Sequence, residues 1–101
     1  YSMSRLGVID LGTNTFHILI VENVDNSGFK EIYRERRFVK LAEEGIENIG
    51  VQAYRRALNA MIDYADILKA YNVEKVQAIG TEALRRAKNG QKGIRWIVFL
   101  F

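Results

Sequence analysis

The hydrophobic and polar positions of this chain follow two periods, one typical of strands and one typical of a helix. Toward the N-terminus, apolar runs predict three strands, over residues 6–11, 16–24 and 29–41. The first run is interpreted as a strand buried on both faces, and the third, rich in charge, as an exposed edge strand. Because the connections are short, we expect the three strands to form an antiparallel meander.

The period then changes to that of a helix over residues 51–71, with Gly50 before it and Asn72 as its end. Residues 73–79 predict a fourth strand, parallel to an earlier one, and residues 81–88 a second helix with Thr81 as N-cap. The order βββαβα indicates an α/β fold with a mixed sheet. The apolar face of the first helix is expected to consist of Tyr54, Ala57, Leu58, Met61, Ala65 and Leu68.

Composition narrows the class of protein. The chain has 101 residues, 49% of them hydrophobic and 27% charged, which is ordinary for a globular domain and not for a disordered chain. Its formal charge of +3 permits an anionic partner. The absence of cysteine excludes disulfides and thiolate metal sites and fits a cytoplasmic location. We expect no signal peptide and no membrane partner, because no apolar run is long enough to span a bilayer.

The connection between the first two predicted strands carries unusual polar chemistry. Gly12 lets the backbone approach an anion, and the hydroxyl groups of Thr13 and Thr15 can donate to it. Asp10, at the end of the first strand, is placed to hold Mg²⁺. The competing interpretation is a hairpin turn whose polar side chains, Asn14 included, bond their own backbone. Spacing alone favours the hairpin.

A second segment changes that balance. Gly80 and Thr81 stand between a predicted strand and a predicted helix, where free N–H groups form an anion site. Arg85 and Arg86 follow within about one helical turn and add charged donors. Alone, this segment would be an ordinary capped surface helix. Two strand ends of this kind in one small α/β unit favour a phosphate site.

The segment VIDLGTNTFH, residues 8–17, resembles the phosphate-1 motif of the actin, sugar-kinase and Hsp70-like fold. Three further segments make the resemblance more specific: ERRFVKL at 35–41, EGI at 44–46, and GTEALRRA followed by NG at 80–90. Together they resemble the exopolyphosphatase and guanosine pentaphosphate phosphatase (Ppx/GppA) family. The resemblance extends over residues 6–91.

This resemblance implies a ribonuclease-H-like half-domain in which Asp10 assists Mg²⁺ and the Gly12–Thr15 loop (Gly12, Thr13, Asn14 and Thr15) cradles phosphate. It also implies that Thr81 and Arg85 border the same cleft. Family members are hydrolases that release terminal phosphate from polyphosphate or guanosine pentaphosphate, and both substrates stay open here. The expected partner is therefore polyphosphate or guanosine penta- or tetraphosphate. The full-length family member is expected to be a homodimer, and no DNA partner is expected.

Some family segments do not occur in this sequence. The catalytic glutamate of the family lies in an S-G-x-E-E-A-R segment, and a second phosphate loop reads D-x-G-G-G-S; neither occurs here. We therefore expect a single partial domain over 1–101, with a family-like lobe at 3–91 and a divergent apolar tail at 92–101. The tail is interpreted as truncated or frameshifted, and a native extra strand is the alternative. That tail favours self-association. The general base is expected downstream, and the chain alone is expected to lack phosphatase activity.

Two other functions compete with this one: a nucleotide-binding regulatory or structural module of the actin/Hsp70-like fold, and a small interaction domain without a ligand. His17 is interpreted as a packed residue and not as an acid or base. Four basic residues could form a polyanion track or simply a charged edge strand: Arg34, Arg36, Arg37 and Lys40.

Overall fold

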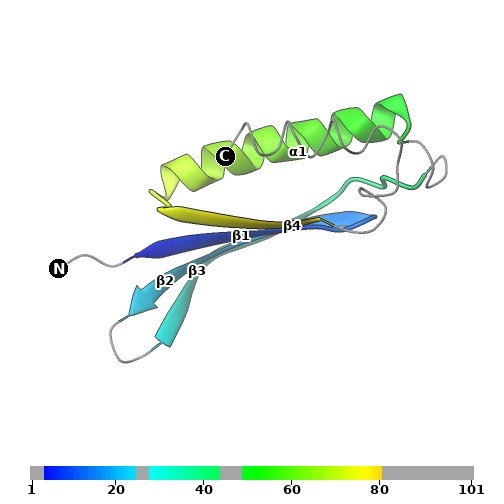
Figure 1. Ribbon diagram of the computed structural model, residues 1–101. Coiled ribbons are helices and arrows are strands. Elements are labelled where there is room, and N and C mark those ends of the chain that lie inside the picture. Colours follow the sequence, from blue (N-terminus) through cyan, green and yellow to red (C-terminus); the bar gives the residue numbers. More distant parts are fainter. Residues whose placement is uncertain (1–3, 25–27, 44–48, 81–101) are drawn as a thin grey trace.

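Four strands pair in the order β3-β2-β1-β4 to form one mixed sheet, and one helix crosses it (Figure 1). The computed structural model describes residues 4–24, 28–43 and 49–80. The neighbours β1 and β2, like β2 and β3, are antiparallel, whereas β4 runs parallel to β1. The elements are β1 at Arg5–Leu11, β2 at Thr15–Val24, β3 at Gly28–Phe38, α1 at Val51–Ala70 and β4 at Lys75–Gly80.

The meander and the parallel fourth strand are confirmed, as is the place of β3 at an edge of the sheet. The third strand is shorter than predicted, because it ends at Phe38 and not at residue 41. The N–H groups of residues 39–41 bond to the β1–β2 connection instead of to a strand, and Lys40 has a φ of 48°. The second predicted helix, at 81–88, lies outside the described residues.

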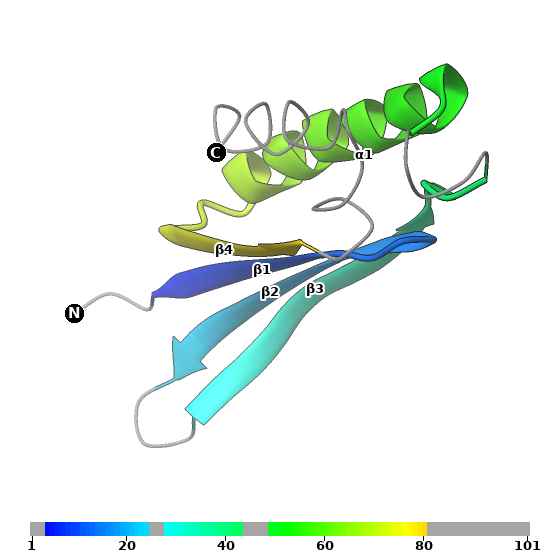
Figure 2. The same ribbon diagram turned by 45° about the vertical axis from the view of Figure 1, so that its right-hand side comes forward.

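Helix α1 lies across one face of the sheet, as two views of the ribbon show (Figure 1 and Figure 2). The core forms between them, because alternate residues of β1 and β2 point to this face. Gly7 allows the close approach of the helix, since a Cβ there would meet Leu68 at 2.5 Å. The largest fully buried side chains are Tyr64, Phe16, Ile9, Ile18, Ile20, Leu41, Met61 and Val39.

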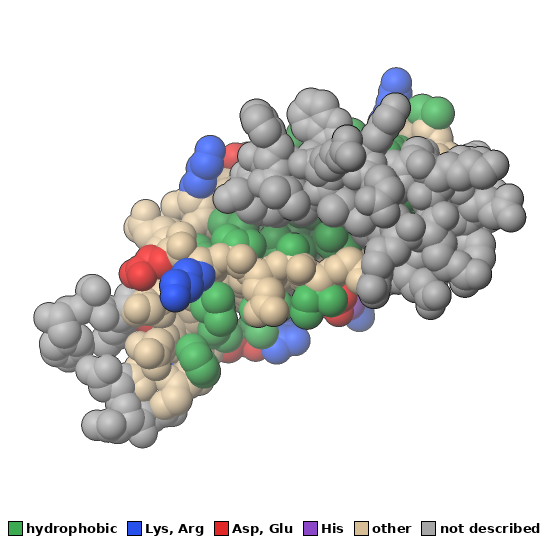
Figure 3. Space-filling model, viewed as in Figure 1, with side chains coloured by type: hydrophobic (Ala, Val, Ile, Leu, Met, Phe, Trp, Pro, Cys, Tyr) green, Lys and Arg blue, Asp and Glu red, His purple; other side chains and the backbone are tan. Residues whose placement is uncertain are grey.

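The opposite face of the sheet is not covered by α1. Leu6 and Val8 of β1 are half-buried and Asp10 is exposed, so the expectation of a strand buried on both faces is wrong for the described structure. His17 in β2 pairs with Asp10 and lies on the same uncovered face, where it is exposed. Its interpretation as a packed residue is therefore also wrong. Figure 3 shows hydrophobic side chains on the molecular surface, and Ile79 of β4 is 51% exposed.

Helix α1 begins and ends next to the residues predicted to flank it, Gly50 and Asn72. Gly50 precedes the helix in an extended conformation and offers no side-chain cap. At the other end Asn72 adopts a φ of 54°, and the N–H groups of Asn72 and Val73 bond to the carbonyls of Lys69 and Leu68. Asn72 therefore ends the helix as predicted. Within the described residues, no helix is long and apolar enough to cross a membrane.

The buried face of α1 differs in part from the predicted one. Met61, Ala65 and Leu68 are buried as expected, whereas Leu58 is only half-buried. Ala53, Ala60 and Tyr64 are buried although they were not predicted to be. The centre of the face is thus rotated toward Ala60 and Tyr64, since the twisted sheet determines which side of the helix it contacts.

Candidate functional site

The connection between β1 and β2 is a tight loop. β1 ends at Leu11 and β2 begins at Thr15, and the Gly12 N–H donates to the Thr15 carbonyl over 3.1 Å. A Cβ at Gly12 would clash with that same carbonyl oxygen, which is a backbone atom with little freedom to move. The loop therefore requires glycine at this position because of the close approach of its two ends.

The carbonyl side of the loop is occupied by the segment at residues 39–41. The N–H groups of Val39 and Lys40 donate to the Asn14 carbonyl at 2.8 and 3.1 Å, and the Leu41 N–H donates to the Thr13 carbonyl at 2.8 Å. Within the described residues, by contrast, the N–H groups of Thr13 and Asn14 have no acceptor. In the described structure the loop thus has the carbonyls of Thr13 and Asn14 bound and two successive N–H donors without a protein acceptor, which is a precondition for binding an anion.

The polar side chains of the loop are also free. Asp10, Thr13, Asn14 and Thr15 make no side-chain hydrogen bond or ion pair to any described part of the chain. The connection is a hairpin in topology, but the interpretation in which its side chains bond their own backbone is wrong for the described structure. Its hydroxyl and amide groups remain available to a ligand.

Asp10 lies exposed at the end of β1, on the face away from α1. It is opposite His17 in β2 and beside Ile79 in β4. No group of three or more potential metal ligands occurs among the described residues, so a site made only of protein ligands is not formed there. One exposed carboxylate would suit Mg²⁺ only together with ligands from outside the protein, because Mg²⁺ is commonly held by one or two carboxylates together with substrate phosphates and water.

The second predicted anion-binding segment cannot be placed, because Thr81 and Arg85 lie outside the described residues. The strand that precedes them is described. β4 ends at Gly80, which pairs with Leu11, the residue just before the Gly12–Thr15 loop. The carboxyl ends of β1 and β4 therefore meet at the same edge of the sheet.

The four basic residues that were considered as a polyanion track, Arg34, Arg36, Arg37 and Lys40, divide into two pairs. Arg34 binds Glu31 at 2.8 Å, and Arg37 binds Asp63. The hydrogen bond that Arg37 donates to Asp63 is the main cause that raises the pKa of Arg37 above its usual value. Arg36 stacks over the Phe38 ring, and neither it nor Lys40 forms an ion pair within the described residues. Of these four, Arg36 and Lys40 therefore remain available for an anion.

Two residues that support the loop were missed in the sequence. Tyr64 donates a hydrogen bond to the Phe16 carbonyl at 3.1 Å, and burial raises the pKa of this phenol to about 12. Arg56 binds the Val39 carbonyl at 2.9 Å. Tyr64 lies three residues after Met61 and four before Leu68, so helical periodicity could have placed it on the buried face. No sequence pattern indicates the partner of Arg56.

Comparisons with known proteins agree on one family. The model of the Ppx/GppA phosphatase family matches residues 19–97. The crystal structure of an exopolyphosphatase from Cytophaga hutchinsonii superposes with a TM-score of 0.86 at 38% identity, over 93% of this chain and 30% of that one. Exopolyphosphatase 2 of Mycobacterium tuberculosis is 30% identical over 87% of this chain and 29% of its own length.

A second type of relative is also found. The guanosine-5'-triphosphate,3'-diphosphate pyrophosphatase of Vibrio atlanticus is 34% identical over 80% of this chain and 16% of its own length. The chain thus spans less than a third of each of these three relatives.

Proposed function

We propose, from the premise that this chain belongs to the Ppx/GppA phosphatase family, that its Gly12–Thr15 loop binds the terminal phosphate of a phosphoanhydride substrate. The substrate class is polyphosphate or guanosine pentaphosphate, since the relatives include both exopolyphosphatases and a guanosine pentaphosphate-type pyrophosphatase. The lobe formed by the sheet and α1 would supply phosphate binding to a hydrolase that releases this terminal phosphate. A nucleotide-binding module without hydrolysis is the alternative.

One observation carries this proposal. The carbonyls of Thr13 and Asn14 are bound by the N–H groups of residues 39–41, whereas the N–H groups of the same two residues have no acceptor in the described structure. Phosphoryl transfer depends mainly on positioning and on neutralising charge, and preorganised N–H donors supply both without reorganisation. The free hydroxyl groups of Thr13 and Thr15 extend the same set of donors.

Asp10 is the residue that would hold Mg²⁺ beside this loop, together with phosphate oxygens and water. When bound, the metal neutralises charge on the phosphate oxygens. The residues of this chain would orient the substrate, because the loop donates to the terminal phosphate. Thr81 and Arg85 are proposed to border the same site from the end of β4.

The carboxylate base that activates water is not among these residues. The chain contains no S-G-x-E-E-A-R segment, which carries this glutamate in the family that the chain resembles. We therefore propose that the 101-residue chain binds the anion but does not release phosphate by itself. Phosphate release from long-chain polyphosphate by the purified chain in the presence of Mg²⁺ would contradict this part of the proposal.

Calorimetric titration with tripolyphosphate, with and without Mg²⁺, tests the binding role. We expect binding to be tighter with Mg²⁺, and the Asp10→Asn variant to lose that increase because an amide does not replace the anionic ligand. Glu74→Gln, at an exposed position just before β4, is the matched control with the same change of charge. Tighter binding of ATP than of tripolyphosphate would favour the nucleotide-binding alternative.

A further inference from the structure

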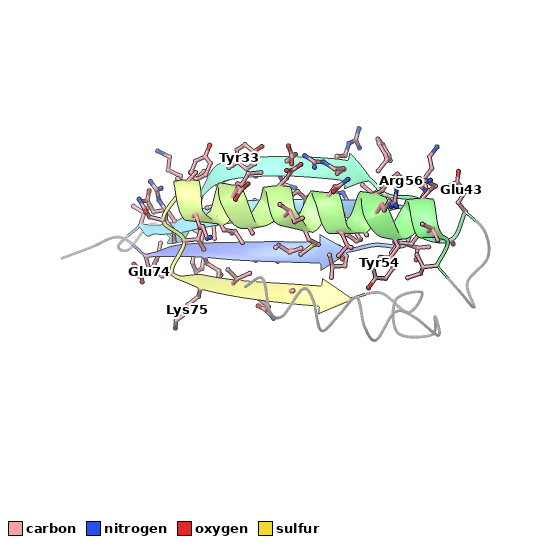
Figure 4. All side chains as sticks on the ribbon, turned by 90° about the horizontal axis from the view of Figure 1, so that it is seen from above. Tyr33, Glu43, Tyr54, Arg56, Glu74 and Lys75 are labelled. Atoms are coloured by element: carbon pink, nitrogen blue, oxygen red, sulfur yellow. The ribbon has the colours of Figure 1, made fainter. Side chains whose placement is uncertain are left out.

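The Arg56 side chain, near the start of α1, donates three hydrogen bonds to residues outside the helix. Its Nε donates to the Val39 carbonyl at 2.9 Å, and its Nη2 donates to the Lys40 carbonyl at 3.4 Å and to Glu43 Oε2 at 2.7 Å. Figure 4 shows Arg56 beside Glu43 at this end of the helix. One guanidinium thus binds two consecutive carbonyls of the 39–41 segment and a carboxylate that follows it.

The same 39–41 segment binds the candidate phosphate loop with its other polar groups. The N–H groups of Val39 and Lys40 donate to the Asn14 carbonyl, and that of Leu41 donates to the Thr13 carbonyl. The peptide groups of the segment therefore connect Arg56 on one side to the loop on the other. Every hydrogen bond in this connection, from Arg56 to the segment and from the segment to the loop, has its donor and acceptor within hydrogen-bond distance.

The conformation of the segment requires such support. Lys40 has a φ of 48°, in the left-handed region that a lysine rarely adopts. The φ of Lys40 lies between the N–H groups of Lys40 and Leu41, which donate to the carbonyls of Asn14 and Thr13, so this conformation determines that both carbonyls can be bound. Strained backbone of this kind persists only where its surroundings hold it in place, and two of the contacts that hold this one come from the Arg56 guanidinium.

We propose that Arg56 is a positioning residue: through the 39–41 segment it keeps the carbonyls of Thr13 and Asn14 bound and their N–H groups directed toward the ligand. The proposal rests on the proposed function of the loop as a phosphate site. Arg56 does not contact the ligand in this scheme. A lysine cannot take its place, because only the planar guanidinium fork reaches both carbonyls and the carboxylate together.

Arg55 provides a matched control. It precedes Arg56 in the same helical turn, is exposed, and makes no hydrogen bond or ion pair with the described residues. Arg55→Gln and Arg56→Gln remove the same charge from neighbouring positions, so a general electrostatic effect on anion binding is the same in both. A positioning effect appears only in Arg56→Gln.

The experiment compares the full chain with its Arg56→Gln, Arg56→Lys and Arg55→Gln variants by two measurements. Tripolyphosphate affinity is measured by titration, and hydrogen exchange of the Lys40 and Leu41 amides is measured by NMR without ligand. We expect binding about tenfold weaker and local exchange about tenfold faster in Arg56→Gln, and Arg55→Gln within about twofold of wild type. Arg56→Lys is expected to show the same direction of change, with charge retained.

The two measurements separate this inference from the proposed function. If the unchanged chain does not bind tripolyphosphate, the proposed function fails, and local exchange alone decides whether Arg56 holds the segment. Equal affinity and equal exchange in Arg56→Gln and Arg55→Gln would overturn the inference. If Arg56→Gln does not fold, Arg56→Lys decides, and wild-type affinity and exchange in that variant would overturn it as well.

Discussion

The Tyr64 hydroxyl group, in the middle of α1, donates a hydrogen bond of 3.1 Å to the main-chain carbonyl of Phe16 in β2. Both side chains are fully buried in the core. Phe16 immediately follows Thr15, so this bond attaches the end of the Gly12–Thr15 loop to the helix. The Arg37 guanidinium carbon lies 5.9 Å from the centroid of the Tyr64 ring, and its charge lowers the pKa of the phenol, whereas burial and the charge of Glu35 raise it.

Replacing Tyr64 by phenylalanine removes this one hydrogen bond and preserves the shape of the core. Because the buried Phe16 carbonyl then loses the hydrogen bond from Tyr64, we expect the free energy of unfolding to fall by about 1 kcal/mol. Urea denaturation followed by circular dichroism measures the change. An unchanged midpoint would mean that the hydrogen bond contributes nothing to stability.

The same residue predicts a dependence of stability on alkaline pH. Burial raises the pKa of Tyr64 to about 12, above its ordinary value of 10.0. Its contribution is complete below pH 10, where the phenol is protonated in both states, and is lost as pH rises toward about 12, because the unfolded chain releases the proton first. The stability difference between wild type and Tyr64→Phe should therefore shrink with rising pH. A difference that grows over this range would contradict the buried, protonated phenol.

Gly12→Ala tests whether the tight loop requires glycine. An added Cβ would clash with the Thr15 carbonyl, so the loop must shift. We expect a loss of about 1–3 kcal/mol in stability and weaker tripolyphosphate binding, measured by urea denaturation and calorimetry. Gly80→Ala is the control for stability alone, because its added Cβ has no atom within 4 Å. Similar losses in both variants would show that the effect is not specific to the loop.

Much of the fold was predictable because its determinants are local. The three-strand meander follows from short apolar runs joined by short polar connections, and α1 from a regular helical period ended by Asn72. The left-handed φ of Asn72 confirms the end of the helix in structural detail. The parallel pairing of β4 with β1 follows from the helix between β3 and β4 in the chain.

The errors come from contacts that join distant parts of the sequence. The apolar run over residues 6–11 predicts burial on both faces, but α1 covers only one, and Asp10 and His17 are exposed on the other. Residues 39–41 continue an alternating pattern, yet their N–H groups bind the loop instead of a strand. No local pattern contains this information, since it depends on where the loop lies in the folded chain.

The residues of the candidate site likewise divide into those predicted from a local sequence segment and those whose contacts span distant parts of the sequence. Asp10 and the Gly12–Thr15 loop were identified from a short segment, and the structure places them together at the ends of β1 and β2. Arg56 and Tyr64 were missed because each acts on a main-chain carbonyl far away in the sequence, which no side-chain pattern indicates. The roles of Thr81 and Arg85 stay predictions, since both lie outside the described residues.

The central claim is that the free N–H groups of the Gly12–Thr15 loop bind phosphate. The most direct test is a titration of the isotope-labelled chain with tripolyphosphate and Mg²⁺, followed by amide NMR, with sulfate at matched ionic strength as the reference. We predict saturable changes in amide chemical shift that are largest at Thr13 and Asn14 and smaller at Thr81 and Arg85. With sulfate we expect no such pattern of changes. Shifts that are absent, or that are equal with sulfate and spread over the exposed basic residues, would contradict the account.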